Sequence, residues 1–540
     1  MNKAYSIIFV VLISIFVFTS CSERPEKGYS DADIFRYNEA AGITSLDPAF
    51  AKNQAHIWVC NQLYNSLVQL DDSLNVIPSL AESWTVDSTG LIYTFQLRKD
   101  VLFHNNACFK PSEDTRILKA SDVVFSLERL RSPELSAPGS WTLSNVKESG
   151  IKAIDDYTVS FELKEPFPAF LGLLTMQYCS ILSEHAFQKF GKDYFEYAIG
   201  TGPFYFKLWV DRVKLVLRKN TDYFEKINGV SLPHLESVAI RFIPDKFAAF
   251  LEFVKGDLDF ISGIDASYKD EVLDFNGDLQ EKYQKDIRLI KQNYLNTEYL
   301  GFLVDQEKST YPYNNRYFRR AVNFAFDRQK MIRYLRNGIG SPAEHGMIPN
   351  GLPSFEKTNS FSFNKDSVLE NLTKSGYVEK GSPEVVLHTN SSYLDLCEYI
   401  QYSLREMGIN LSIEVHPPST LRQLISAQKV QFFRASWIAD YPDAENYLSL
   451  FYSENFAPNG PNYTHFKLDE FDAMYKACYV ETDLDKRRSL YRKMNRIIME
   501  EAAVVPLFYD EVYRFSAKGT QGLGGNALNL LSLKNVKKSE

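Results

Sequence analysis

One short segment, residues 436–447, holds the side chains whose types and spacing are best suited to bind a ligand. It contains Trp437, Asp440 and Tyr441. The residues before it, 430–435, are mostly apolar and predict a short buried strand. Strand ends that open into loops are where α/β proteins keep their ligand contacts. We therefore predict that Trp437, Asp440 and Tyr441 contact a ligand.

The same segment also allows structural roles for its residues. A loop aspartate such as Asp440 can accept hydrogen bonds from its own backbone, and a tryptophan such as Trp437 can belong to the core. Asp443 follows Pro442 and precedes a helix start, which predicts that it caps a helix N-terminus. We assign ligand contact to Asp440 and capping to Asp443.

No enzyme motif is recognisable in the sequence. It has no His-Glu-x-x-His zinc motif, no Gly-x-Ser-x-Gly nucleophile elbow and no Walker loop. The Gly-x-Gly at residues 200–202 is not a phosphate loop, because Pro203 removes an amide donor and no strand–turn–helix context follows. The histidines are scattered without the spacing of a metal site; they are His56, His104, His185, His234, His345, His388, His416 and His465. We predict no enzymatic activity, no metal ion and no cofactor.

Length and charge limit the class of protein further. A chain of 540 residues exceeds the size of one hydrophobic core, so two or three lobes are expected. The net charge is −8, and no basic stripe indicates nucleic acid binding. Tyrosine is abundant, at 32 residues, and its flat apolar face with a hydroxyl suits a water-containing cleft.

The first residues predict a secretory signal peptide over residues 1–20. Lys3 supplies a positive charge, and residues 7–18 are almost wholly apolar, which is shorter than the about 20 residues of a spanning helix. The small-small-Cys ending at Cys21 resembles a bacterial lipobox, which implies cleavage before Cys21 and lipidation of its thiol. Residues 21–32 would form the lipidated tether, anchored by acyl chains at about 0.8 kcal/mol per buried methylene. The alternative is an ordinary signal peptide with an incidental cysteine.

The cysteines predict no disulfide. If Cys21 is lipidated, an odd set remains, so at least one thiol must be free. The remaining residues are Cys60, Cys108, Cys179, Cys397 and Cys478. We expect them to act as small buried apolar side chains.

Hydrophobic periodicity predicts a multi-lobe α/β chain. Residues 240–264 and 385–415 each have the pattern strand, helix, strand, which indicates parallel strands covered by helices. Apolar residues at helical spacing also predict one helix over 57–70 and another over 315–335.

Several motifs resemble one family. Residues 437–446, W-I-A-D-Y-P-D-A-E-N, resemble the W-x-A-D-Y-x-D-P-x-N pattern of the large extracellular solute-binding proteins of ABC importers, the oligopeptide- and dipeptide-binding group. Ala444 stands where that pattern usually has Pro. Further stretches with family patterns lie at residues 101–127, where Asn106 replaces the usual Gly, at 200–204 with 220–224, and at 318–328. The resemblance spans nearly the whole mature chain.

The resemblance implies an α/β fold like class II periplasmic binding proteins, with mixed sheets flanked by helices. Two lobes would be joined by two hinge strands, which we place at residues 297–302 and 504–509. Lobe I, with a subdomain, would cover residues 33–297, lobe II residues 298–504, and residues 505–540 would return to lobe I. A ligand would enter between the lobes, hinge rotation would close them, and the complex would dock on an ABC permease.

The resemblance also implies roles for single residues. In peptide-binding members, the residue that matches Asp440 pairs with the α-ammonium group of the ligand, through charge-assisted hydrogen bonds worth about 1.5–3 kcal/mol. Trp437 matches a pocket wall. Asn53, Gln54 and Trp141 lie where family members approach the ligand, so we add them to the predicted site.

We therefore expect a monomeric, lipid-anchored substrate-binding protein on the periplasmic side of the bacterial cell envelope, with peptides as ligands and no nucleic acid partner. A non-peptide ligand on the same fold, such as a metal chelate, haem or an oligosaccharide, is one alternative. A ligand-sensing surface lipoprotein and a lipid-anchored hydrolase are the others.

Overall fold

The computed structural model describes residues 30, 33–110, 115–264, 268–305, 307–358 and 361–539. The predicted signal peptide (1–20), Cys21 and all other residues of the predicted tether except Ser30 lie outside these ranges. Among the residues described, no helix has both the length and the apolar character needed to cross a membrane.

The central element is a mixed sheet of eleven strands with the order β17-β16-β18-β14-β19-β13-β1-β12-β9-β8, and with β15 beside β19. Its strands are β1 (Ile34–Asn38), β8 (Phe204–Val210), β9 (Lys214–Lys219), β12 (Ser237–Arg241), β13 (Phe260–Ser262), β14 (Ile287–Phe302), β15 (Ser341–Pro342), β16 (Val385–Thr389), β17 (Leu411–Val415), β18 (Phe432–Ile438) and β19 (Val504–Ala517). The strands β17, β16 and β18 are parallel, as are β13, β1 and β12, whereas the neighbours from β18 through β14 and β19 to β13 are antiparallel.

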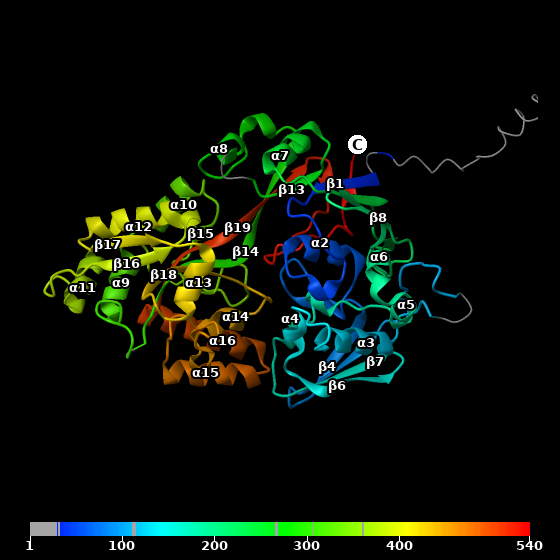
Figure 1. Ribbon diagram of the computed structural model, residues 1–540, viewed down its shortest axis with the longest axis horizontal. Coiled ribbons are helices and arrows are strands. Elements are labelled where there is room, and N and C mark those ends of the chain that lie inside the picture. The colour runs from blue at the N-terminus through cyan, green and yellow to red at the C-terminus, as the bar shows by residue number, and fades with distance from the viewer. Residues whose placement is uncertain are drawn as a thin grey trace, which may run out of the picture.

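Two long antiparallel strands, β14 and β19, form the middle of this sheet and divide the molecule (Figure 1). β14 continues the sheet toward β18, β16 and β17, whereas β19 continues it toward β13, β1 and β12. Their pairing runs from Ile287 opposite Ala517 to Gly301 opposite Val504, and its register shifts near Thr297. Such irregularities locally disrupt the hydrogen bonds between the paired strands. The predicted hinge strands at 297–302 and 504–509 are parts of β14 and β19.

The first half comprises β13, β1, β12, β9 and β8, together with a separate antiparallel sheet of order β4-β5-β7-β6. The additional strands are β2 (Val68–Leu70), β3 (Val76–Pro78), β4 (Ala81–Val86), β5 (Ile92–Leu97), β6 (Val146–Asp155), β7 (Thr158–Leu163), β10 (Lys226–Ile227) and β11 (Val230–Ser231). The helices are α2 (Gln54–Leu63), α3 (Ala120–Arg131), α4 (Phe170–Leu173), α5 (Glu184–Phe190), α6 (Tyr194–Tyr197), α7 (Lys246–Lys255) and α8 (Lys269–Val272), with 3₁₀ turns η2 (Pro48–Phe50), η3 (Ser140–Leu143) and η4 (Gln177–Cys179). One apolar core joins both sheets and includes Trp58, Phe95 and, from the end of the chain, Leu531.

The second half comprises β18, β16 and β17 with the helices around them. These are α9 (Arg316–Phe324), α10 (Arg328–Leu335), α11 (Lys365–Ser375), α12 (Leu394–Glu406), α13 (Pro418–Ser426), α14 (Glu445–Leu448), α15 (Asp469–Val480) and α16 (Leu484–Glu501), with the 3₁₀ turn η8 (Ser391–Tyr393). The chain ends in a short pair, β20 (Thr520–Gln521) and β21 (Lys537–Lys538). The predicted strand–helix–strand unit at 385–415 is confirmed, because β16 and β17 are parallel and α12 connects them.

Two helix predictions are wrong. The predicted helix over 57–70 is α2, which begins at Gln54 under an Asn53 cap and ends at Leu63, while Val68–Leu70 pairs with β3 as strand β2. The predicted helix over 315–335 is two helices. The Asp327 side chain accepts the main-chain N–H of Lys330 and starts α10, because a short polar side chain competes with the helix ladder.

The five cysteines within the described residues, Cys60, Cys108, Cys179, Cys397 and Cys478, are free and buried. Their burial agrees with the prediction that they act as small apolar side chains.

Candidate ligand-binding site

The loop after β18 is held in place by one buried side chain, that of Asn446. Its Oδ1 atom accepts the indole N–H of Trp437 at 2.8 Å and the main-chain N–H of Asp440 at 3.3 Å. Asn446 lies in α14, directly after the loop, and is only 4% exposed. The loop therefore has a defined shape with the Trp437 ring and the Asp440 backbone fixed relative to each other.

The Asp440 side chain is partly shielded by the protein around it. It is exposed to solvent, yet burial by the surrounding protein raises its pKa above the ordinary value of 3.8, an effect that a hydrogen bond with Asn446 partly offsets. The pKa of Tyr178, in η4 of the first half, is raised by burial and then by the negative charge of Asp440. Asp440 is thus exposed to solvent and close enough to Tyr178 of the first half for its charge to affect that phenol.

Tyr441 is buried between the two halves. Its ring centroid lies 6.4 Å from that of Trp141 and 6.3 Å from that of Phe167. Ala169, directly before α4, and Leu173 in α4 complete this apolar contact, and α4 lies beside α14 in Figure 1. The structure therefore brings together two predicted site residues, Trp141 and Tyr441, from opposite halves.

Glu445 collects hydrogen bonds from three phenols. The hydroxyls of Tyr441, Tyr475 and Tyr479 all donate to its carboxylate, the last at 3.1 Å. Burial raises the pKa of Glu445, and the phenols oppose this rise because they stabilise the charged form. This carboxylate is only 4% exposed and holds the Tyr441 hydroxyl inside the protein.

Asp443 serves the structure of the loop, as predicted. Its Oδ1 atom accepts the main-chain N–H of Glu445, the first residue of α14, at 2.9 Å. Its other oxygen lies 3.3 Å from the guanidinium of Arg487 in α16. The N-cap position of α14 is Ala444 and not Asp443, so the prediction is correct in giving Asp443 a structural bond to the helix start but places the cap one residue too early.

Asn53 and Gln54 lie at the exposed N-terminus of α2. The Asn53 Oδ1 atom caps this helix, accepting the main-chain N–H of His56 at 3.2 Å, and it lies 2.6 Å from Nδ1 of the same histidine. Within the part of the chain that the structure describes, no hydrogen bond or ring contact joins Asn53 or Gln54 to the Asp440 loop.

Two cavities adjoin this region. One of 320 Å³ lies between the halves and is lined by Leu74–Val76, Trp84, Pro168, Ala169, Leu171 and Gly172 of the first half and by Leu352–Ser354, Pro442–Ala444, Leu484, Arg487, Arg488 and Tyr491 of the second. A larger one of 630 Å³ is lined mainly by polar residues of the first half, including Asn61, Thr175 and Gln177. Thr175 and Gln177 line this larger cavity, and the adjacent Tyr178 is close to Asp440. The segment 175–178 therefore lies between the larger cavity and the loop after β18.

A buried ion pair beside the loop was missed by the sequence analysis. Arg434 in β18 pairs with Glu298 in β14, and its guanidinium lies 3.3 Å from the ring centroid of Tyr393. The Tyr393 hydroxyl donates to the same carboxylate at 3.3 Å. The signal was present in the sequence, since an arginine inside an apolar strand requires a buried partner.

Comparison with known proteins agrees with this architecture. The family described as bacterial extracellular solute-binding proteins, family 5, middle region, matches residues 75–459, more than half of the chain. The glutathione-binding protein GsiB of Salmonella choleraesuis is 25% identical over 489 residues, which cover 89% of this chain and 90% of that protein.

Two solved structures share the fold. HbpA2 from Haemophilus parasuis has a TM-score of 0.83 at 23% identity, covering 94% of this chain and 100% of that one. The ABC transporter-associated periplasmic binding protein DppA from Helicobacter pylori, in complex with the peptide STSA, has a TM-score of 0.70 at 25% identity, covering 94% and 98%. The predicted α/β fold class is confirmed. The chain therefore belongs to family 5 of the bacterial extracellular solute-binding proteins of ABC transporters, and it is a binding protein and not an enzyme.

Proposed function

We propose that this protein captures peptides in the crevice between its two halves and delivers them to the permease of an ABC importer. The observation that carries this proposal is the Asp440 carboxylate, which is exposed to solvent and close enough to Tyr178 of the opposite half to raise the pKa of that phenol. Every free peptide has an α-ammonium group, so one carboxylate can bind peptides of many sequences. A charge-assisted hydrogen bond of this kind contributes about 1.5–3 kcal/mol.

The other predicted site residues have complementary roles in this proposal. Trp437 and Trp141, the latter 39% exposed, supply aromatic walls from the two halves. Tyr441 positions the loop, because its ring and hydroxyl are already engaged by protein. The exposed first turn of α2, with Asn53 and Gln54, approaches the ligand backbone.

The names of related proteins support a ligand of the peptide class. GsiB is named for glutathione, a small peptide, and the DppA structure holds a peptide. In our proposal peptide backbone groups align as an added strand, and water-filled pockets accept varied side chains.

Closure over the ligand would proceed by rotation about β14 and β19, the two strands that join the halves. The lobes would then comprise residues 33–297 with 505–540, and residues 298–504. If the rotation that closes the two lobes is prevented, ligand binding is expected to weaken while the fold of each half stays the same.

Calorimetric titration tests the peptide proposal. A mixed library of short peptides is screened first, and the best binder is then compared with its own N-acetylated form, which lacks the ammonium group. We expect one site per chain and at least about tenfold weaker binding of the acetylated form. Equal affinity of the two forms would contradict the proposed contact between Asp440 and the ammonium group. Cleavage of any peptide would indicate a hydrolase.

We also propose a monomer on the periplasmic side of the envelope, anchored through acyl chains on Cys21. The variant Cys21→Ser is expected to appear in the soluble fraction after cell breakage, while the parent protein remains with membranes. Retention of the variant in the membrane fraction would contradict the lipid anchor. The elution volume in size-exclusion chromatography tests the monomer.

A further inference from the structure

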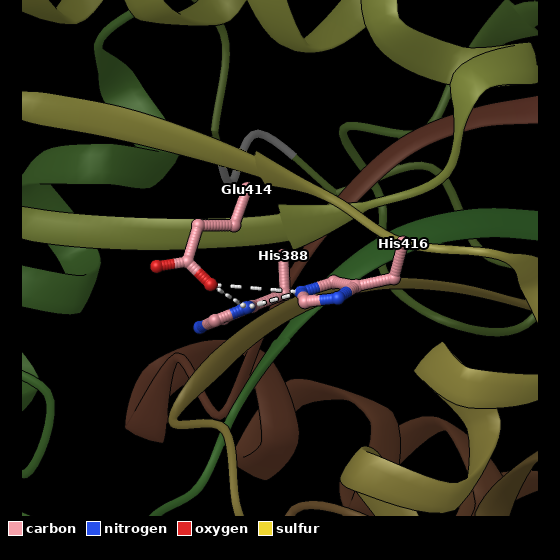
Figure 2. A group of neighbouring side chains, drawn as sticks. All are labelled: His388, Glu414 and His416. Atoms are coloured by element: carbon pink, nitrogen blue, oxygen red, sulfur yellow. Dashed lines mark hydrogen bonds and ion pairs between the residues drawn. The ribbon is translucent and has the colours of Figure 1, made fainter.

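Three side chains capable of binding a metal ion converge on the edge of the sheet in the second half (Figure 2). His388 lies in β16, Glu414 lies in the edge strand β17, and His416 follows the end of β17. His388 is directly opposite Glu414 in the parallel pairing of these strands. Glu414 and His416 are two residues apart, so the pleat directs them to the same face.

The separations of the ligand atoms fit one small cation. Nδ1 of His388 lies 3.0 Å from Nε2 of His416 and 3.4 Å from Oε2 of Glu414, and the last two atoms are 3.7 Å apart. In a tetrahedral site with bonds of about 2.0–2.1 Å, neighbouring ligand atoms lie about 3.3–3.4 Å apart. An ion could therefore bind all three atoms after shifts of a few tenths of an ångström.

The backbone holds these side chains in place before any ion binds. The main-chain N–H of His416 donates to the carbonyl of Thr389 at 2.9 Å, which ties the end of β17 to β16. The side chains of His388 and His416 are 14% and 20% exposed, whereas that of Glu414 is 57% exposed. The arrangement is thus walled by protein on the imidazole side and open to solvent on the carboxylate side.

We propose that His388, Glu414 and His416 form a binding site for a divalent transition-metal ion of the Zn²⁺ class. Two imidazoles and one carboxylate suit Zn²⁺, Ni²⁺ or Cu²⁺, whereas Mg²⁺ and Ca²⁺ prefer oxygen ligands alone. Three protein ligands leave the fourth tetrahedral position open to water or to a donor atom of another molecule.

This metal site is separate from the proposed peptide site. His388 is paired with Phe433 of β18, and Trp437 lies four residues further along that strand, a distance of about 13 Å at 3.3 Å per residue. The metal proposal therefore does not depend on the proposed function, and either one can fail alone.

The competing explanation is a hydrogen bond between the two imidazoles, one of which donates its N–H to the other, with Glu414 beside them. In that case the cluster only joins β17 to β16 and has no affinity for metal ions. Direct measurement of metal binding separates these explanations.

The test uses the purified, tag-free protein, treated with a chelator and titrated with ZnCl₂ in a calorimeter. We expect one ion per chain. His388→Ala and His416→Ala should each weaken binding by about 100-fold or more, beyond the 10–100-fold typical of changes around a metal site. Glu414→Gln should weaken it at least about tenfold. Because Glu414 is exposed, this variant is expected to keep its fold.

A matched control and two further measurements complete the test. His234→Ala, at a histidine of the first half outside the cluster, should bind Zn²⁺ like the parent protein. Co²⁺ should give the visible absorption bands of a tetrahedral site in the parent but not in His388→Ala. Zn²⁺ should raise the Tm of the parent more than that of Glu414→Gln, while peptide binding by Glu414→Gln stays unchanged. Absence of Zn²⁺ binding to the parent, or binding by all three cluster variants that equals binding by the parent, would overturn the proposal.

Discussion

Asp440, in the loop after β18, and Glu445, at the start of α14, are five residues apart and have opposite environments. Glu445 is 4% exposed and accepts hydrogen bonds from three tyrosine hydroxyls. Asp440 is exposed, and the loop binds it through its main-chain N–H. Burial raises the pKa of both carboxyls. The number of protein donors therefore distinguishes a carboxylate that stabilises the fold from one that can bind a ligand.

The two carboxylates are nevertheless connected through Tyr441. Its hydroxyl donates to Glu445, and its ring packs against Trp141 of the first half. Glu445 therefore supports the contact between the halves from inside the protein, while the Asp440 side chain beside it is exposed to solvent. Variants at the two positions should affect different measurable properties, stability at Glu445 and ligand affinity at Asp440.

Glu445→Ala has the largest expected effect. Three hydroxyls, those of the buried Tyr441 and Tyr475 and of the partly buried Tyr479, would lose their common acceptor, which should lower the free energy of unfolding by about 3 kcal/mol or more. Urea unfolding followed by tryptophan fluorescence measures this change. Glu398→Ala, at an exposed glutamate of α12, is the control and should change stability by less than about 0.5 kcal/mol. Equal small effects at both positions would contradict the structural role of Glu445.

Asp440→Asn tests the other side of the comparison. The variant keeps the shape of the side chain and removes its charge, so peptide affinity should fall at least about tenfold, or about 1.4 kcal/mol. The Tm should stay close to that of the parent, because Asp440 is exposed and its main-chain hydrogen bond remains. Calorimetric titration and a thermal melt measure both properties. A lower Tm with unchanged peptide affinity would contradict this prediction, because it would show that Asp440 stabilises the fold and does not bind the ligand.

Short-range patterns in the sequence predicted some of these features. The position of Asp443 after Pro442 and before a helix start was sufficient to predict that its side chain bonds the backbone at that start, because such bonds involve residues only a few positions apart. Hydrophobic periodicity predicted β16, α12 and β17 for the same reason. The arrangement of the fold as two halves joined by two strands came from the family resemblance, since periodicity alone indicates only a multi-lobe α/β protein.

Contacts between distant residues were not predictable in this way. Spacing along the chain does not reveal that the ring of Tyr441 packs against Trp141. It also does not reveal that Glu445, and not Asp440, accepts the hydrogen bonds from the Tyr475 and Tyr479 hydroxyls. These contacts depend on how the halves and α15 pack.

The cluster of His388, Glu414 and His416 was missed for a related reason. The histidines were judged by their spacing in sequence, whereas the register of two parallel strands brings them together. The break between α9 and α10 was missed because Asp327 caps a helix inside a continuous apolar pattern.

The dependence of peptide affinity on pH gives a further test of Asp440. Its pKa lies above 3.8, so the carboxyl takes up a proton at a higher pH than an ordinary aspartate. A peptide ammonium requires the charged form, so affinity should be full at neutral pH and should fall as the pH drops through the raised pKa. In Asp440→Asn this decline should be absent. Titrations at several pH values measure it, and the same decline in both proteins would assign it to another group.

Asp443→Asn has the smallest expected effect on peptide affinity and tests the comparison most closely, because this third carboxylate lies between the other two in sequence. The amide oxygen can still accept the main-chain N–H of Glu445, but the ion pair with Arg487 is lost. That pair is largely buried, and the guanidinium would be left without its charged partner, so we expect a loss of about 2 kcal/mol in unfolding free energy. Peptide affinity should change less than about threefold. Denaturant unfolding and calorimetry measure the two quantities. If Asp443→Asn weakens peptide binding as much as Asp440→Asn does, the ligand responds to the charge of the whole loop and not to a single carboxylate.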